Sequence, residues 1–156
     1  MAVPHAVMDL TTKGMNVVHR GLLAVSGGRI GRTAMGMPAV ELHTIGRRSG
    51  QRRSVMLTTP VHEHDRIVLI ASKGGDDRHP DWYRNLVAEP DVEITMDGET
   101  RPFRARTATA GEKAELWPKV VAAYKGYAGY QKRTTRDIPV VICEARDRRD
   151  GDRTSP

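Results

Sequence analysis

The sequence is poor in cysteine, in aromatic side chains and in long apolar runs. Its 156 residues include one cysteine, Cys143, which excludes an internal disulfide framework and a cysteine-based zinc site. No apolar run approaches the roughly 20 residues of a membrane-spanning helix. The N-terminus lacks a basic region followed by a clean apolar core, so no signal peptide is predicted. A cytoplasmic chain with one main domain is expected.

Aromatic residues number only two Trp, four Tyr and one Phe. Their scarcity matters because the chain is basic, with 25 Lys+Arg against 19 Asp+Glu and a net charge of +6, which suggests a polyanionic partner. Proteins that bind single-stranded nucleic acid set aromatic platforms among their cations. No aromatic residue lies between Gly46 and Arg53, where four arginines gather, so we expect no nucleic-acid partner. A nucleic-acid-binding module remains the remote alternative.

The positive charge is concentrated in one segment. From Arg29 to Arg53 there are six arginines and one acid, Glu41, which accounts for nearly the whole net charge. Four of these arginines lie in the turn-prone sequence GRRSGQRR. Such a cluster is either a solvated hairpin tip or an anion site, because arginine forks and glycine amides both suit phosphate and carboxylate oxygens.

A second region has similar chemistry. Ser72, Lys73, Gly74 and Gly75 follow the β-branched run RIVLI, where a strand is expected to end. Backbone amides, a lysine and a hydroxyl at a strand exit form a compact anion cradle, although no Walker motif is present. Together with the arginine turn, this segment predicts a groove for an extended, multiply charged ligand.

Three tyrosines, Tyr124, Tyr127 and Tyr130, are spaced by three and would share one side of a helix. They form either a packed stripe or a cover for a flat ring, to which they could donate hydrogen bonds. Metal catalysis is not expected. Of the six histidines only His62 and His64 are close, in a predicted surface turn.

The pattern of elements predicts a mainly β fold with peripheral helices (α+β), in which an antiparallel sheet closes or half-closes into a small barrel. The expected strands are 39–45, 53–61, 66–72, 91–96, 100–107 and a last one in IPVVICEA, and the expected helices are 8–25, 81–89 and 109–124. Thr109 and Glu112 form a capping box, and Asp97-Gly98 is a strong hairpin signal. We divide the chain into an N-terminal amphipathic helix and glycine-rich loop (1–38), the barrel (39–145) and a mobile polar tail (146–156).

Four blocks of the sequence together match a known family: LHTIGRRSGQRR, IVLIASKGGDDRHPDWYRNLVAEP, the WP of AELWPKVVAAY, and YQKRTTRDIP. They span roughly residues 40 to 145. With these blocks the sequence resembles the deazaflavin (F420)-dependent oxidoreductases of actinobacteria, which include deazaflavin-dependent nitroreductase and F420H2-dependent quinone reductases. Each motif alone is a weak signal, whereas their combination is specific.

The resemblance implies a split β-barrel, related to that of the FMN-binding pyridoxamine-phosphate oxidases, with F420 as cofactor. It implies that the anionic part of F420 contacts Arg47, Arg48, Ser49 and Arg53. It further implies a groove lined by Ile70, Ala71, Ser72 and Lys73 and by Asp81, Trp82, Tyr83, Arg84 and Asn85. Tyr124, Tyr127 and Tyr130 would close over the acceptor side of the ring, with Ser72 nearby and Tyr127 also touching the cofactor.

The implied reaction is hydride transfer from reduced F420 to an electron-poor small molecule. Tyr130 or Tyr127 is the candidate to orient the acceptor and to donate a hydrogen bond to the oxygen on which charge develops. The sequence departs from the family pattern at Arg52, at Met56, where proline is frequent, and at Thr58 in the acceptor pocket. Quinones and activated enones of the coumarin type are therefore expected acceptors alongside nitro compounds. An FMN-dependent split barrel and a non-catalytic F420-binding protein remain the alternatives.

Two further expectations concern partners. The N-terminal helix carries only Lys13, His19 and Arg20 on its polar face, which favours packing on the barrel over peripheral contact with a membrane. Both a monomer and a homodimer are compatible with the sequence.

Overall fold

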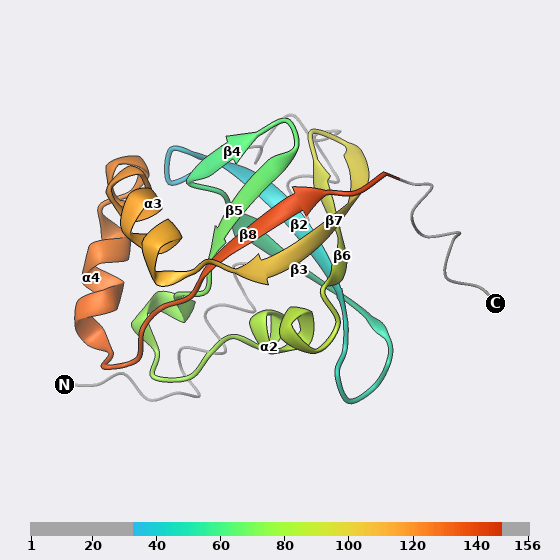
Figure 1. Ribbon diagram of the computed structural model, residues 1–156, viewed down its shortest axis with the longest axis horizontal. Coiled ribbons are helices and arrows are strands. Elements are labelled where there is room, and N and C mark those ends of the chain that lie inside the picture. Colours follow the sequence, from blue (N-terminus) through green and yellow to red (C-terminus); the bar gives the residue numbers. More distant parts are fainter. Residues whose placement is uncertain (1–32, 148–156) are drawn as a thin grey trace.

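The computed structural model describes residues 33–147, which form a curled antiparallel sheet with helices outside it (Figure 1). The strands are β1 (Thr33–Ala34), β2 (Met37–Ile45), β3 (Arg52–Thr58), β4 (Val61–Glu63), β5 (Arg66–Ile70), β6 (Asp91–Met96), β7 (Glu99–Thr107) and β8 (Val140–Ala145). The helices are the 3-10 turn η1 (Lys73–Gly75), α2 (Asp81–Ala88), α3 (Ala110–Ala123) and α4 (Gly126–Arg133). The predicted mainly β fold of the split-barrel type is confirmed. The helix expected at 8–25 lies outside the described residues.

Two tight hairpins follow from turns with positive φ. Asp97 and Gly98 have φ values of 53° and 80°, as the Asp-Gly signal predicts. Met35 and Gly36 have φ values of 55° and 76° and join β1 to β2. The sheet therefore already includes Thr33 and Ala34, which precede the predicted barrel boundary at residue 39, and Met35 gave no turn signal.

The strand order explains why the sheet curls. The main path runs β1-β2-β6-β7-β8-β5-β4, and β3 pairs with the other side of β2. Strands β3 and β4 are thus on opposite edges, yet only Thr59 and Pro60 separate them in sequence. The buried Thr59 donates its hydroxyl to the carbonyls of Val61 and Val68, and its amide bonds the Pro38 carbonyl. This seam draws the two edges together into a half-barrel.

The same seam corrects one predicted element. A single strand was expected over residues 53–61, but the chain leaves the β2 ladder after Thr58 and enters the β5 ladder at Val61. Proline ends the first strand because Pro60 has no N–H to donate to a ladder.

The molecule has two apolar cores, one on each side of the sheet. Ile67, Leu69 and Cys143 face the barrel interior, where they join Phe103 and residues of α2, while Val68 and its neighbours face α3 and α4. Strands β5 and β8 are therefore buried on both faces, which explains their nearly continuous apolar sequences. Cys143 is a core side chain, as predicted, and burial raises the pKa of its thiol to about 12.

The helices cover one end and one face of the barrel. Helix α2 lies across an open end, whereas α3 and α4 pack beside β5 and β8 (Figure 1). The predicted capping box is confirmed, since Thr109 Oγ1 accepts from the Glu112 amide and the Glu112 carboxylate accepts from the Thr109 amide. Within residues 33–147 no helix is long and apolar enough to cross a membrane.

Candidate active site

The arginine turn is a tight hairpin between β2 and β3. Its ends are joined by a 2.8 Å bond from the Gly46 amide to the Gln51 carbonyl, and Gly50 has a φ of 68°. A Cβ on Gly46 would lie 2.5 Å from Ser49 Oγ, so a larger residue there would displace the Ser49 hydroxyl. Ser49 Oγ accepts from the Gln51 amide and from Arg53 Nη2. The turn thus presents a hydroxyl and several guanidinium groups at one tip.

Arg47 ties this hairpin to α2. Its Nη1 donates to Asn85 Oδ1 at 3.0 Å, its amide donates to the same oxygen at 3.2 Å, and its Nη2 pairs with Asp81 at 3.4 Å. Asn85 is buried and donates in turn to Thr44 Oγ1. The structure therefore joins the hairpin with two of the α2 residues that the resemblance implied, Asp81 and Asn85.

The other hairpin arginines differ in their surroundings. Arg48 is exposed and makes no ion pair or hydrogen bond with the residues 33–147. Arg52 lies on the outer face of the sheet, where it pairs with Glu93 at 3.2 Å. The resemblance did not place Arg52 among the cofactor contacts, and its geometry separates it from Arg47.

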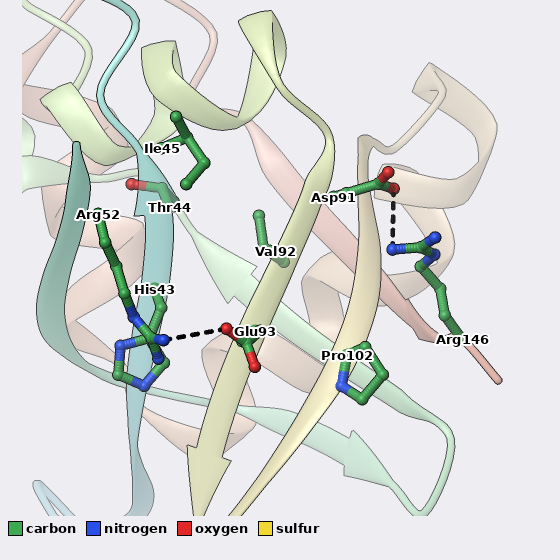
Figure 2. A pocket seen from close by; sticks show the side chains of 9 residues that line it. All are labelled: His43, Thr44, Ile45, Arg52, Asp91, Val92, Glu93, Pro102 and Arg146. Atoms are coloured by element: carbon green, nitrogen blue, oxygen red, sulfur yellow. Dashed lines mark ion pairs between the residues drawn. The ribbon is translucent and has the colours of Figure 1, made fainter. Parts of the chain in front are cut away.

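The outer sheet face contains a shallow hollow of about 270 Å³ around Arg52 (Figure 2). Figure 2 shows its charges paired with one another, Arg52 with Glu93 and Arg146 with Asp91. His43, also on its wall, bonds Ser54 through Nδ1 and Thr95 through Nε2. The hollow contains none of the predicted site residues, and its paired charges leave little for a ligand.

The predicted anion cradle is a strained turn at the end of β5. Lys73, Gly74 and Gly75 have φ values of 46°, 62° and 84°, which is an unusual conformation for a lysine. Ser72 is buried, and its carbonyl accepts from the Gly75 amide at 2.9 Å. The turn presses on α4, because a Cβ on Gly75 would lie 2.8 Å from the Tyr130 carbonyl oxygen.

Sequence reasoning missed the residue that holds this turn. Arg136 donates to the carbonyls of Ala71, Ser72 and Asp76 at 2.8–3.1 Å, and to His79 Nδ1 at 3.1 Å. Only its place in the block YQKRTTRDIP could have drawn attention to it. Burial and the nearby guanidinium groups of Arg136 and Arg84 lower the pKa of His79.

The three tyrosines form one cluster on α4 and just before it. Their ring centroids lie 5.4–6.3 Å apart in tilted or edge-to-face pairs. Tyr127 is buried, with its hydroxyl 3.2 Å from Thr58 Oγ1 on β3. Burial, followed by a hydrogen bond with Tyr124, raises the pKa of Tyr130 to about 12, and burial also raises the pKa of Tyr127. The cluster is packed and also partly open, since Tyr130 and Tyr124 are half-buried.

Helix α4 links the tyrosine cluster to the glycine turn. Arg133 lies over the ring of Tyr130 at 5.6 Å and donates to the Gly74 carbonyl. Along the lower side of the molecule in Figure 1, α4, η1, α2 and the β2–β3 hairpin follow one another. The seven residues of β3 span roughly 20 Å at about 3.3 Å per residue, so Thr58 and the arginine turn are well separated. A ligand that reaches both is long.

Several predicted groove residues have their side chains elsewhere. Trp82 is in the barrel core, and Ala71 is fully buried. Tyr83 directs its hydroxyl to Thr107 Oγ1 on β7 at 2.9 Å. The backbone of Ala71 is also engaged, its amide with the Pro139 carbonyl and its carbonyl with Arg136. The predicted contacts of Ala71, Trp82 and Tyr83 with the cofactor stay untested predictions.

The half-barrel has a cationic hairpin at one end and a tyrosine cluster beside a glycine turn at the other, an arrangement compatible with the class of split-barrel oxidoreductases. Comparison with known proteins identifies the family. Residues 18–145 match the family described as F420H(2)-dependent quinone reductase, and the chain belongs to that family.

Individual relatives agree. An F420H(2)-dependent quinone reductase of Mycobacterium tuberculosis strain H37Rv is 38% identical over 133 residues, which cover 83% of this chain and 89% of that one. A structure described as an F420-H2 dependent reductase (FDR-A) superposes with a TM-score of 0.62 at 41% identity, covering 69% of this chain and 94% of its own. A second structure, described as a domain-swapped dimer, has a TM-score of 0.65 at 36% identity, covering 82% and 96%. The predicted family, reaction class and cofactor, F420H2, are confirmed.

The described residues fit this cofactor by their chemistry. F420 joins a flat deazaflavin ring to a phosphate and a glutamate tail, so its site needs cations at one end and aromatic surface at the other. Arg48 and Arg53 supply exposed guanidinium groups next to the Ser49 hydroxyl. At the far end of the row, Tyr124 and Tyr130 supply half-buried aromatic surface beside the glycine turn.

Proposed function

We propose that this chain reduces a quinone-type acceptor with F420H2, and that the row of segments from the β2–β3 hairpin to α4 is the site. The observation that carries the proposal is the exposed charge of Arg48, which has no ion-pair partner among residues 33–147, at the tip of a hairpin whose neighbouring residue, Arg47, is fixed to α2. An anion held there gains charge-assisted hydrogen bonds without breaking an existing ion pair.

The ring end of the site is proposed to lie between Ser72 and the tyrosine cluster. When bound, the reduced cofactor supplies a hydride to an electron-poor acceptor. The protein has to orient two flat molecules face to face and exclude competing reactions. Tyr124, Tyr127 and Tyr130 are proposed to cover the acceptor, with Tyr130 donating a hydrogen bond to the oxygen on which negative charge develops.

Tyr130 suits that donor role because its half-buried ring borders the glycine turn, where an acceptor could replace Tyr124 as the partner of its hydroxyl. Tyr127 is proposed to hold the floor of the pocket, since its hydroxyl is already engaged with Thr58. Ser72, which is buried at the start of the glycine turn, is proposed to border the ring. These roles favour a flat carbonyl compound, which is why we name quinones first and activated enones and nitro compounds after them.

Two broader aspects of the protein are also proposals. A structural relative is described as a domain-swapped dimer, and we propose a homodimer for this chain, which sedimentation analysis would test. We keep packing against the barrel as the role of the N-terminal segment and peripheral membrane contact as its alternative, which flotation of the full chain with anionic vesicles would detect. No nucleic-acid partner is proposed.

The test is a titration of the purified chain with F420, followed by oxidation of F420H2 in the presence of a quinone, a coumarin and a nitroimidazole. We expect binding at micromolar concentration and the fastest oxidation with the quinone. Absence of F420 binding would refute the assignment. Binding without oxidation by any acceptor would indicate a non-catalytic F420-binding protein, and a yellow chain that retains FMN would indicate the FMN alternative.

A further inference from the structure

Arg136 makes the densest set of hydrogen bonds to one segment of the described chain. Its Nε donates to the Asp76 carbonyl at 2.8 Å, its Nη2 to the Ser72 carbonyl at 2.9 Å, and both Nη atoms to the Ala71 carbonyl at 3.1 Å. Nη1 also bonds His79 Nδ1 at 3.1 Å. One side chain therefore spans the whole segment from Ala71 to His79.

This arrangement requires arginine. Its guanidinium has five N–H donors in a flat fork, which can serve several acceptors in one plane, whereas a lysine ammonium is a compact point charge. Since a guanidinium only donates, His79 Nδ1 must be an acceptor, which fixes the neutral imidazole with its proton on Nε2.

The segment needs an external clamp because its own conformation is unfavourable. Lys73 is in the left-handed region at a φ of 46°, which costs an L-residue about 1–2 kcal/mol. Its two internal bonds, from the amides of Gly75 and Asp76, close only the short turn itself. In a trans peptide bond the carbonyl and the N–H of the next residue point in opposite directions. Since the Ala71 and Ser72 carbonyls point toward the Arg136 guanidinium, the N–H groups of Ser72 and Lys73 point away from it.

Arg136 is itself held by the two helices α3 and α4. Gln131 Nε2 donates to the Arg136 carbonyl at 2.8 Å, while Gln131 Oε1 accepts from the Ile138 amide at 3.0 Å. Lys113 on α3 bonds the Ile138 carbonyl at 2.7 Å and pairs with Asp137. The backbone that carries the guanidinium is thus held by α3 and α4, independently of the contacts that the guanidinium makes with the turn.

We propose that Arg136 is a positioning residue for the F420 ring site, which acts by setting the backbone of Ser72–Asp76 in the conformation that borders the ring. The inference rests on the proposed location of the ring beside this turn. It assigns to Arg136 no contact with the acceptor and no part in hydride or proton transfer.

The test compares Arg136→Lys and Arg136→Gln with Arg106→Lys as the matched control. Arg106 also uses its guanidinium fork for several acceptors, but these are the carboxylates of Glu112 and Glu144 and not the glycine turn. We measure F420 affinity by fluorescence, Tm without cofactor, and kcat and KM for the quinone. Nitrogen NMR of His79 without cofactor reports whether Nδ1 still accepts a hydrogen bond.

Loss of a charged hydrogen-bond network predicts that both Arg136 variants bind F420 about tenfold or more weakly, while KM for the quinone stays within about twofold. The signal of His79 Nδ1 should change in both, and Arg106→Lys should leave F420 affinity and the His79 signal unchanged. Arg136→Lys binding F420 as the parent chain does would overturn the proposal. Unfolding of both variants would also overturn it, because Arg136 would then serve the fold alone. Failure of the parent chain to bind F420 is a separate result, which refutes the proposed function.

Discussion

At the scale of single residues, Tyr130 is the side chain on which the proposed chemistry depends most. Its pKa is raised to about 12 by burial and by its bond with Tyr124, so it keeps its proton through the whole physiological range. We predict that Tyr130→Phe lowers kcat/KM for the quinone by about a hundredfold to a thousandfold, the usual effect of removing one donor to a developing oxyanion. Steady-state kinetics check this, with F420 affinity as the internal control.

The raised pKa of Tyr130 also makes the stability of the fold depend on pH. The folded pKa lies above the ordinary value of 10.0, so the folded state binds more protons than the unfolded state between these values. The contribution of Tyr130 to stability is therefore present below pH 10 and declines as the pH rises toward about 12.

An unchanged kcat/KM in Tyr130→Phe for every acceptor would contradict the kinetic prediction and remove the hydrogen-bonding role from this residue.

His79 provides a second measurable pKa. Burial, then the charges of Arg136 and Arg84, lower it from 6.5, so the imidazole is neutral at pH 7. The unfolded chain then binds more protons just below pH 6.5, and stability falls as the pH drops through that window. We predict that NMR titration finds the pKa of His79 below 6.5 and that Arg136→Gln moves it upward. A pKa above 6.5 in the parent chain would contradict the geometry, because protonated Nδ1 could not accept from Arg136.

At the scale of elements, the hairpin arginines allow a matched comparison. Arg47 bonds the buried Asn85, whereas Arg48 has no partner among residues 33–147. We predict that Arg48→Ala weakens F420 binding about tenfold and changes the free energy of unfolding by less than about 0.5 kcal/mol. Arg47→Ala should in addition destabilise the fold by about 0.5–1.5 kcal/mol, since Asn85 Oδ1 loses the Nη1 donor and keeps only the backbone amide of residue 47.

Urea unfolding and fluorescence titration measure the two effects separately. Arg52→Ala is the control, because Arg52 faces the outer sheet and pairs with Glu93. An effect of Arg52→Ala on F420 affinity equal to that of Arg48→Ala would indicate a diffuse charge effect rather than a site at the hairpin tip.

The features that could be predicted from the sequence are those that depend on neighbouring residues within one turn or helix end. The Asp97-Gly98 turn and the Thr109 capping box are set by neighbours within a few residues, and both were predicted. The β1–β2 turn was missed because Met35 carries no preference for positive φ. Arg136 was missed as a site residue because its partners lie about 60 residues away and are backbone carbonyls, which leave no mark in the sequence.

At the scale of the whole molecule, the barrel depends on the seam between β3 and β4. Thr59 is fully buried, and its hydroxyl donates to the Val61 and Val68 carbonyls on the β4–β5 side, while its amide bonds the Pro38 carbonyl on β2. We predict that Thr59→Val, which keeps the shape and removes the donor, costs about 1–3 kcal/mol of unfolding free energy. The exposed Thr135 is the control, since Thr135→Val should change stability little. Equal stability of the parent and Thr59→Val would show that the two edges meet without this bond.

The net charge of +6 makes a final prediction about the whole molecule. If this charge acts locally at the hairpin, it should strengthen binding of the anionic tail of the cofactor and leave binding of the ring unchanged. We therefore predict that F420 affinity falls as salt rises from about 0.05 M to about 0.5 M, because added salt shortens the Debye length to a few ångströms. The affinity for the same deazaflavin ring without phosphate and glutamate should stay nearly constant.

Arg48→Ala connects this prediction to the structure. Because Arg48 is the exposed guanidinium with no partner among the described residues, its loss should flatten the salt dependence of F420 binding, whereas Arg52→Ala should leave the slope as it is. If the affinities for the ring alone and for F420 depend on salt concentration with the same slope, the arginines of the hairpin do not attract the anionic tail of the cofactor. In that case the excess of arginine would serve solubility, and the tail of the cofactor would be held by neutral donors such as Ser49 and the backbone amides of the turn.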